Sequence, residues 1–144
     1  MPPKDFEPAS TERTGNIDTL SVTAGKSTGR RILVIEDDPD IVETVERILR
    51  SAGHDVKSTT RGDDAFRLVS LLNPELVITD VIMPEIDTID AIAQFRRLYP
   101  RLKIIAISGN PHLLTLAAKN GANHTLAKPF SLHQLSVLVK VALQ

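Results

Sequence analysis

The sequence predicts an α/β fold in which helices cover both faces of a parallel sheet. From residue 30 onward, short apolar runs alternate with stretches whose apolar residues recur at helical spacing, and this pairing repeats five times. The best-defined runs are apolar almost throughout, as is typical of strands buried on both faces of a sheet. The links between runs are short, so the connections must be right-handed crossovers that place helices on both faces.

The first strand is expected at 31–36 and leads into a helix. Asp38 is a favoured N-cap residue and Pro39 suits the first helical position, so the helix begins there. Gly53 marks its end, because glycine readily adopts the left-handed backbone that follows many helices. The apolar residues in between recur at helical spacing: Ile41, Val42, Val45, Ile48 and Leu49.

A weaker second strand is expected at 54–59, where Val56 is the main apolar anchor. The helix after it closes at Asn73-Pro74. Its apolar stripe consists of Ala65, Leu68, Val69 and Leu72. The third strand, at 76–79, is of the buried type and ends at Asp80.

The third helix stops at Pro100 and carries the apolar residues Ile89, Ile92, Phe95 and Tyr99. A fourth strand is expected at 103–108. The pair Asn110-Pro111 then repeats the cap and proline of the first helix, and Gly121 ends this fourth helix.

A short fifth strand at 123–127 precedes the last helix. Ser131 and Gln134 form a capping box at its start, and its stripe consists of Leu135, Leu138, Val139 and Ala142. In parallel sheets of this kind, functional groups gather beyond the carboxyl ends of the strands.

Residues 1–29 differ from the rest of the chain. Fourteen of these twenty-nine residues are Ser, Thr, Pro or Gly, which predicts a flexible leader ahead of a folded domain at 30–144. Gly25-Lys26-Ser27-Thr28 resembles the end of a phosphate-binding loop. Leu20 stands where that motif requires its first glycine, so a polar linker is the preferred interpretation.

The composition excludes several classes of protein. Seventeen basic and eighteen acidic side chains give a formal charge of −1, without the basic excess that nucleic acids or membrane surfaces attract. The chain has no cysteine, which excludes disulfides, thiolate metal sites and a cysteine nucleophile. No apolar run is long enough to span a bilayer, and no secretory signal is present. We therefore expect a cytoplasmic protein.

Polar residues follow four of the predicted strands. Acidic residues follow the first strand, and Asp80 lies at the end of the third. Ser108 lies at the end of the fourth strand, and Lys128 follows the fifth. The acidic residues after the first strand are Glu36, Asp37 and Asp38. Carboxylates that converge in this way repel one another unless a cation neutralises them, and all-oxygen ligands favour Mg²⁺. Asp38 alone is more simply explained as the helix cap.

An aspartate at the tip of a buried strand, beside Mg²⁺ and a lysine, is well placed to attack phosphorus in line. Phosphoryl transfer mainly requires positioning and neutralisation of charge. The metal, Lys128 and the Ser108 hydroxyl would meet these needs around Asp80. The combination predicts a phosphoacceptor site.

Four motifs, in this order and spacing, identify the resemblance of the folded part. They are Ile32-Leu33-Val34-Ile35-Glu36-Asp37-Asp38-Pro39-Asp40, Leu76-Val77-Ile78-Thr79-Asp80-Val81-Ile82-Met83-Pro84, Ile105-Ala106-Ile107-Ser108-Gly109, and the segment from Gly121-Ala122 to Lys128-Pro129-Phe130. The sequence resembles the receiver domains of two-component response regulators over residues 30–144. This resemblance implies a flavodoxin-like (βα)5 fold with a doubly wound parallel sheet in the strand order 2-1-3-4-5.

The resemblance also implies a role for each site residue. Asp80 would accept a phosphoryl group from a histidine kinase or a histidine phosphotransfer protein. Mg²⁺ would be held by Glu36, Asp37, Asp80 and the backbone carbonyl of Ile82. Lys128 would pair with Asp80 or its phosphate. In addition, Ser108 would hydrogen-bond a phosphoryl oxygen, and the Lys128-Pro129 peptide would be cis.

Two positions depart from the family pattern. Thr125 stands where the family usually has Tyr or Phe, so a switch based on an aromatic rotamer is impossible. In the turn after the phosphoacceptor, Ile86-Asp87-Thr88 replaces the usual Met-Asp-Gly. A left-handed backbone would strain Thr88, which predicts a different shape for this loop.

Three functions fit these observations. The leading prediction is a single-domain response regulator that signals through contact with a downstream protein, because the chain stops directly after the last helix. Such a protein assists its own phosphorylation and dephosphorylation but is not an enzyme, and it neither binds nucleic acid directly nor inserts into membranes. The alternatives are a phosphorylation-independent interaction module with the same fold, and a receiver fragment of a larger regulator or hybrid kinase.

Overall fold

The computed structural model describes residues 29–144. Five parallel strands form the central sheet in the spatial order β3-β2-β4-β7-β8. Numbered along the chain, these strands have the order 2-1-3-4-5, which confirms the predicted fold class. The strand bounds are Arg31–Ile35 for β2, Asp55–Thr59 for β3, Leu76–Asp80 for β4, Lys103–Ser108 for β7 and His124–Ala127 for β8. The predicted leader lies outside the described residues, apart from Gly29.

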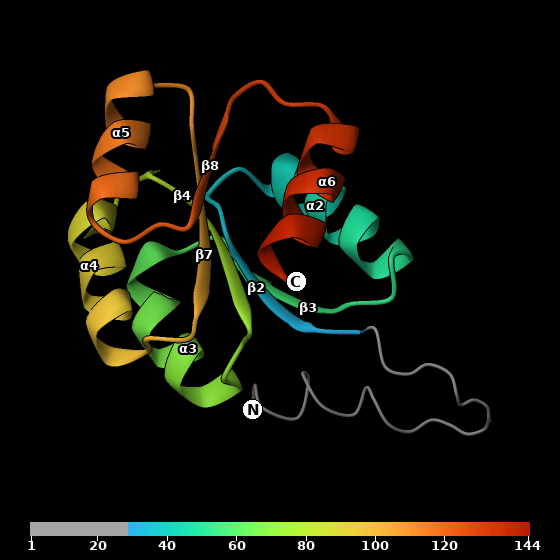
Figure 1. Cartoon of the computed structure of the whole chain (residues 1–144), viewed down its shortest axis with the longest axis horizontal. Helices are drawn as coiled ribbons and strands as arrows, with labels where there is room; N and C mark the ends of the chain where they lie inside the picture. Colours follow the sequence, from blue (N-terminus) through green and yellow to red (C-terminus); the bar gives the residue numbers. More distant parts are fainter. Residues whose placement is uncertain (1–28) are drawn as a thin grey trace.

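Helices cover both faces of the sheet, with α2 and α6 on one face and α3, α4 and α5 on the other (Figure 1). The helix bounds are Pro39–Ser51 for α2, Ala65–Leu72 for α3, Thr88–Leu98 for α4, Pro111–Lys119 for α5 and Leu132–Ala142 for α6. Within residues 29–144, no helix is both long and apolar enough to cross a bilayer.

Each face of the sheet has its own hydrophobic core, because side chains along a strand alternate between the two faces. Leu33 and Val77 pack with α3, α4 and α5 around Phe95, which is 2% exposed. Their neighbours Val34 and Ile78 belong to the second core, beneath α2 and α6. The parallel pairing of the strands brings their carboxyl ends to the same edge of the sheet.

The predicted helix starts are confirmed. Asp38 accepts a hydrogen bond from the backbone N–H of Asp40, and Asn110 accepts from the N–H groups of His112 and Leu113. Ser131 and Gln134 form both hydrogen bonds of the capping box. These caps orient α2, α5 and α6 at the edge of the sheet where the strands end.

The loop between β4 and α4 contains two elements that the sequence did not predict. The two-residue strands β5, Ile82–Met83, and β6, Ile86–Asp87, pair as an antiparallel hairpin. Asp87 then caps α4, so that Thr88 is its first residue. Among the described non-glycine residues only Asn73 has a positive φ, of 49°. Thr88 therefore escapes the left-handed strain that a family-like turn would impose.

A short 3₁₀ turn between β3 and α3, η4 at Gly62–Asp64, was also not predicted.

Candidate functional site

Three carboxylates meet at the carboxyl edge of the sheet. Glu36 follows β2 and Asp80 ends β4, and their side chains are buried, with residue exposures of 3% and 6%. Asp37 is exposed beside them. Each of the three offers one oxygen, and these oxygens lie within 4.8 Å of one another. We call these residues the acidic cluster; its donor set of hard oxygens suits a small divalent cation such as Mg²⁺.

Lys128 lies between the two buried carboxylates. Its Nζ atom is 3.0 Å from Asp80 Oδ2 and 3.2 Å from Glu36 Oε1. The backbone of the lysine is fixed as well, because its N–H donates to the carbonyl of Ser108 at 3.0 Å. The following Lys128-Pro129 peptide is cis, as the resemblance implied. The predicted pairing of Lys128 with Asp80 is thus present, and Glu36 shares the same ammonium.

Backbone N–H groups hold the other oxygen of each buried carboxylate. Asp80 Oδ1 accepts from the N–H of Ile82 at 3.0 Å, and Glu36 Oε2 accepts from the N–H of Asp38 at 3.1 Å. In both cases the donor lies two residues after the acid. Both carboxylates are therefore oriented from two sides, by a backbone amide and by Lys128. Sequence analysis missed these donors, since nothing in the side chain of Ile82 or Asp38 signals a backbone contact.

Burial and charge change the acid–base behaviour of the site. The pKa of Glu36 is raised from 4.5 to about 7, first by burial and then by the nearby charge of Asp80. The hydrogen bond from Asp38 and the charge of Lys128 oppose this rise without cancelling it. Burial lowers the pKa of Lys128, but the hydrogen bond to Asp80 and the charge of Glu36 outweigh it, and the net shift is upward. Lys128 therefore stays cationic, while Glu36 exchanges a proton near neutral pH.

Ser108 reaches the same edge at the end of β7. The register of β4 with β7 sets Asp80 opposite Ile107, one residue before the serine. Ser108 is 1% exposed, and its Oγ accepts from the N–H of Asn110 at 3.1 Å. Since the hydroxyl oxygen is the acceptor in this contact, its hydrogen can be donated to a third group. The side-chain oxygen of Asn110, Oδ1, accepts from the N–H groups of His112 and Leu113 and so caps α5.

Two further positions complete the surroundings of the acidic cluster. Ile82 is 58% exposed, so an exposed apolar side chain lies two residues after Asp80. The carbonyl of Ile82 stays a predicted metal ligand, and its N–H is already engaged by Asp80. Thr125 lies half-buried on β8, opposite Ala106 on β7.

The family described as the response regulator receiver domain matches residues 32–140. The chain is 37% identical over 114 residues to the DNA-binding transcriptional regulator NtrC of Azospirillum brasilense, covering 78% of this chain and 24% of that protein. It is 33% identical over 105 residues to the chemotaxis protein CheY of Thermotoga maritima, covering 71% of this chain and 88% of that protein. A crystal structure of a response regulator from Chloroflexus aurantiacus, itself described as putative, has a TM-score of 0.76 at 30% identity, covering 81% of this chain and 98% of that one. The chain spans about a quarter (24%) of the length of the NtrC relatives that it matches.

Proposed function

The chain belongs to the response regulator receiver family, and we propose that Asp80 accepts a phosphoryl group from a phosphohistidine. The donor would be a histidine kinase or a histidine phosphotransfer protein. A bond forms between a carboxylate oxygen of Asp80 and phosphorus, while the bond between phosphorus and the donor imidazole breaks. The imidazole nitrogen keeps the electron pair of the broken bond and takes up a proton on leaving. The protein is thus the acceptor in this reaction and not an enzyme acting on another substrate.

The observation that carries this proposal is the contact of one ammonium with two buried carboxylates. Lys128 donates to Asp80 Oδ2 and lies beside Glu36, so positive charge is already present where phosphoryl oxygens would arrive. Receiver domains generally bind Mg²⁺, and the acidic cluster fits that ion. When bound, Mg²⁺ would add charge neutralisation for the incoming phosphoryl group. Glu36, Asp37 and Asp80 would hold it, together with the carbonyl of Ile82.

Ser108 links the acceptor to the helix that follows β7. A phosphoryl group adds up to about two negative charges and three acceptor oxygens. The Ser108 hydroxyl can donate to one of these oxygens, while its Oγ stays bonded to the N–H of Asn110. Movement of Ser108 would therefore displace Asn110 and the start of α5. We assign the response to this loop, because Thr125 offers no ring to turn inward.

The domain is proposed to act alone, through contact with a downstream protein. The match to this chain covers 88% of the CheY protein, which supports a receiver that acts alone. The match covers only 24% of the NtrC protein, which fits a receiver within a longer chain. The intact mass of the protein purified from its own cells distinguishes the two. A mass equal to the 144-residue chain supports the single-domain form, and a larger mass overturns it.

Acetyl phosphate tests the phosphoacceptor directly. With Mg²⁺ present, intact-mass spectrometry of the parent protein should show the addition of one phosphoryl group. Asp80→Asn should remove this label and leave the melting curve cooperative. Asp38→Asn is the matched control, since asparagine keeps the helix cap and this variant should be labelled like the parent. Full labelling of Asp80→Asn would overturn the assignment, and an unlabelled parent would favour the phosphorylation-independent module.

A further inference from the structure

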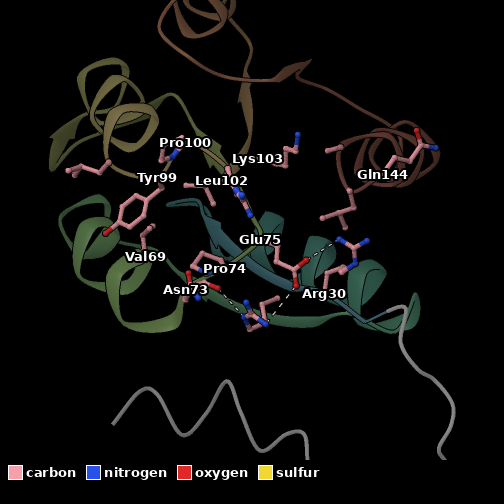
Figure 2. A pocket seen from close by; sticks show the side chains of 15 residues that line it. Arg30, Val69, Asn73, Pro74, Glu75, Tyr99, Pro100, Leu102, Lys103 and Gln144 are labelled. Atoms are coloured by element: carbon pink, nitrogen blue, oxygen red, sulfur yellow. Dashed lines mark hydrogen bonds and ion pairs between the residues drawn. The ribbon is translucent and has the colours of Figure 1, made fainter.

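A groove of about 740 Å³ runs along the edge of the sheet opposite the acidic cluster, where β2, β4 and β7 begin (Figure 2). We call it the basal groove. Its polar and aromatic lining includes Arg30, Arg31, Glu75, Tyr99, Arg101 and Lys103. The volume lies within the range of small-molecule sites, roughly 300–1,000 Å³. The function proposed above makes no use of this edge.

Positive charge dominates the basal groove. Its single acidic side chain, Glu75, is already bound by two arginines, with Arg30 Nη1 at 3.0 Å and Arg31 Nη1 at 3.7 Å. Arg101 and Lys103 have no carboxylate partner within residues 29–144. The whole chain has a formal charge of −1, so this excess of cations is local. The unpaired cations therefore create an attractive field for an anion.

The wall that carries the unpaired cations is held rigidly from behind. Arg96 Nη1 donates to the carbonyls of Pro100 at 3.0 Å and Leu102 at 2.8 Å, and Arg96 Nη2 donates to Gly121 O at 2.9 Å. The backbone of Lys103 joins the sheet, because its N–H donates to the carbonyl oxygen of Glu75 at 3.1 Å. Because the backbone of this turn is fixed, an arriving anion would order two side chains and not a loop, which lowers the entropic cost of binding.

An aromatic ring lies at one side of the same groove. Figure 2 shows the ring of Tyr99 beside Val69, on the flank of the groove formed by α3 and the turn after α4. Tyr99 is half-buried and packs against the core beneath α3 and α4. A ring that is supported on one side by the core offers a surface on which a flat base can stack.

We propose that the basal groove binds a polyphosphate-bearing small molecule of the nucleotide class. Arg101 contacts phosphate oxygens through its guanidinium fork, and Lys103 adds a second point charge. The ring of Tyr99 contacts the attached base. This ligand class combines strong negative charge with a flat ring, which are the two features that the groove complements. The proposal does not depend on chemistry at Asp80.

Isothermal titration calorimetry with ATP, inorganic tripolyphosphate and adenosine tests this assignment. The titrations contain EDTA, so that a metal–nucleotide complex cannot occupy the acidic cluster. ATP should bind more tightly than tripolyphosphate, and adenosine should bind weakest. Arg101→Ala and Lys103→Ala should each weaken both phosphate ligands about tenfold, since each removes a charge-assisted contact. Tyr99→Leu should weaken the binding of ATP but not that of tripolyphosphate, which has no base. If ATP binds no more tightly than tripolyphosphate, or if Tyr99→Leu weakens the binding of both ligands equally, the groove does not recognise a base and the nucleotide class is overturned.

Two controls make the outcome decisive. Arg97 is an exposed cation on α4 outside the groove lining, and Arg97→Ala should bind ATP like the parent. Arg101→Glu should abolish binding while the melting temperature stays near that of the parent, because this side chain is exposed. The absence of ATP binding to the parent, or equal loss in the Arg97 and Arg101 variants, would overturn the proposal. Acetyl phosphate labelling of Asp80 should be the same in all these variants, so the two proposals fail independently.

Discussion

In the metal-free protein, ionisation of Glu36 should lower the free energy of unfolding as the pH rises from 4.5 to 7, when the parent is compared with a variant that lacks this carboxylate. The pKa of Glu36 is raised from 4.5 to about 7 by burial and by the charge of Asp80. Across this window the folded protein holds a proton that the unfolded chain has released. Rising pH removes that proton from the folded state at a cost, so stability is lost. At about 1.4 kcal/mol per pKa unit, the contribution of this one group is about 3 kcal/mol.

Urea unfolding in EDTA at several pH values measures this effect. Glu36→Gln removes the charge, and the amide oxygen can still accept from the N–H of Asp38. Its stability relative to the parent should therefore rise by about 3 kcal/mol between pH 4.5 and pH 7. The matched control is Glu43→Gln, an exposed glutamate on α2 whose variant should follow the parent. Parallel pH profiles for Glu36→Gln and the parent would refute the reasoning. Added Mg²⁺ should reverse the loss in the parent, because the ion favours ionised Glu36.

The remaining predictions concern the metal, the lifetime of the phosphoryl group and the fold. Asp37→Asn should abolish the rise in melting temperature that Mg²⁺ gives the parent; a full Mg²⁺ response would place the ion elsewhere. Ile82→Asn should speed loss of the phosphoryl group, followed by mass spectrometry, because an exposed apolar side chain cannot orient the attacking water. Decay no faster than that of the parent would contradict this shielding. Thr125→Tyr should leave the decay rate similar but alter binding of a downstream partner. Gly121→Ala should lower the free energy of unfolding by about 1–3 kcal/mol in urea titrations, since Gly121 has a φ of 127° and a Cβ there would lie 2.8 Å from Arg96 Cβ; an unchanged midpoint would argue against this strain.

Local signals explain why the secondary structure was largely predictable. Asp38 before Pro39 and Asn110 before Pro111 each combine a side-chain cap with a fixed φ, and both helices begin there. The β5–β6 hairpin gave no such signal, since strands of two residues have no measurable alternation. It forms between Met83 and Ile86 as part of the loop packed over η4, where Gly62 lies close to both residues.

The site was predictable as a set of residues but not as a set of contacts. Parallel strands end at one edge, so the topology alone brings Glu36 and Asp80 together. The sharing of Lys128 between them depends on side-chain rotamers, and the raised pKa of Glu36 depends on burial by distant segments. The basal groove is harder still to predict. Its cations lie far apart in sequence, at Arg31 and Lys103 for example, and only the parallel register of β2, β4 and β7 brings them to the same edge of the sheet.

The packing of α5 explains how a signal can leave this receiver without an aromatic switch. The end of β7 is joined to β4, since Val81 N–H donates to Ile107 O at 2.9 Å, and Ser108 is bonded to Asn110, the cap of α5. All of α5 lies within the described residues, and Ala117 is its only buried residue. Little apolar burial therefore opposes a shift of this helix, whereas α6 is anchored by several buried residues. We expect a phosphoryl group that draws Ser108 toward Asp80 to move α5 as a unit, a change that a threonine at the usual aromatic position does not prevent.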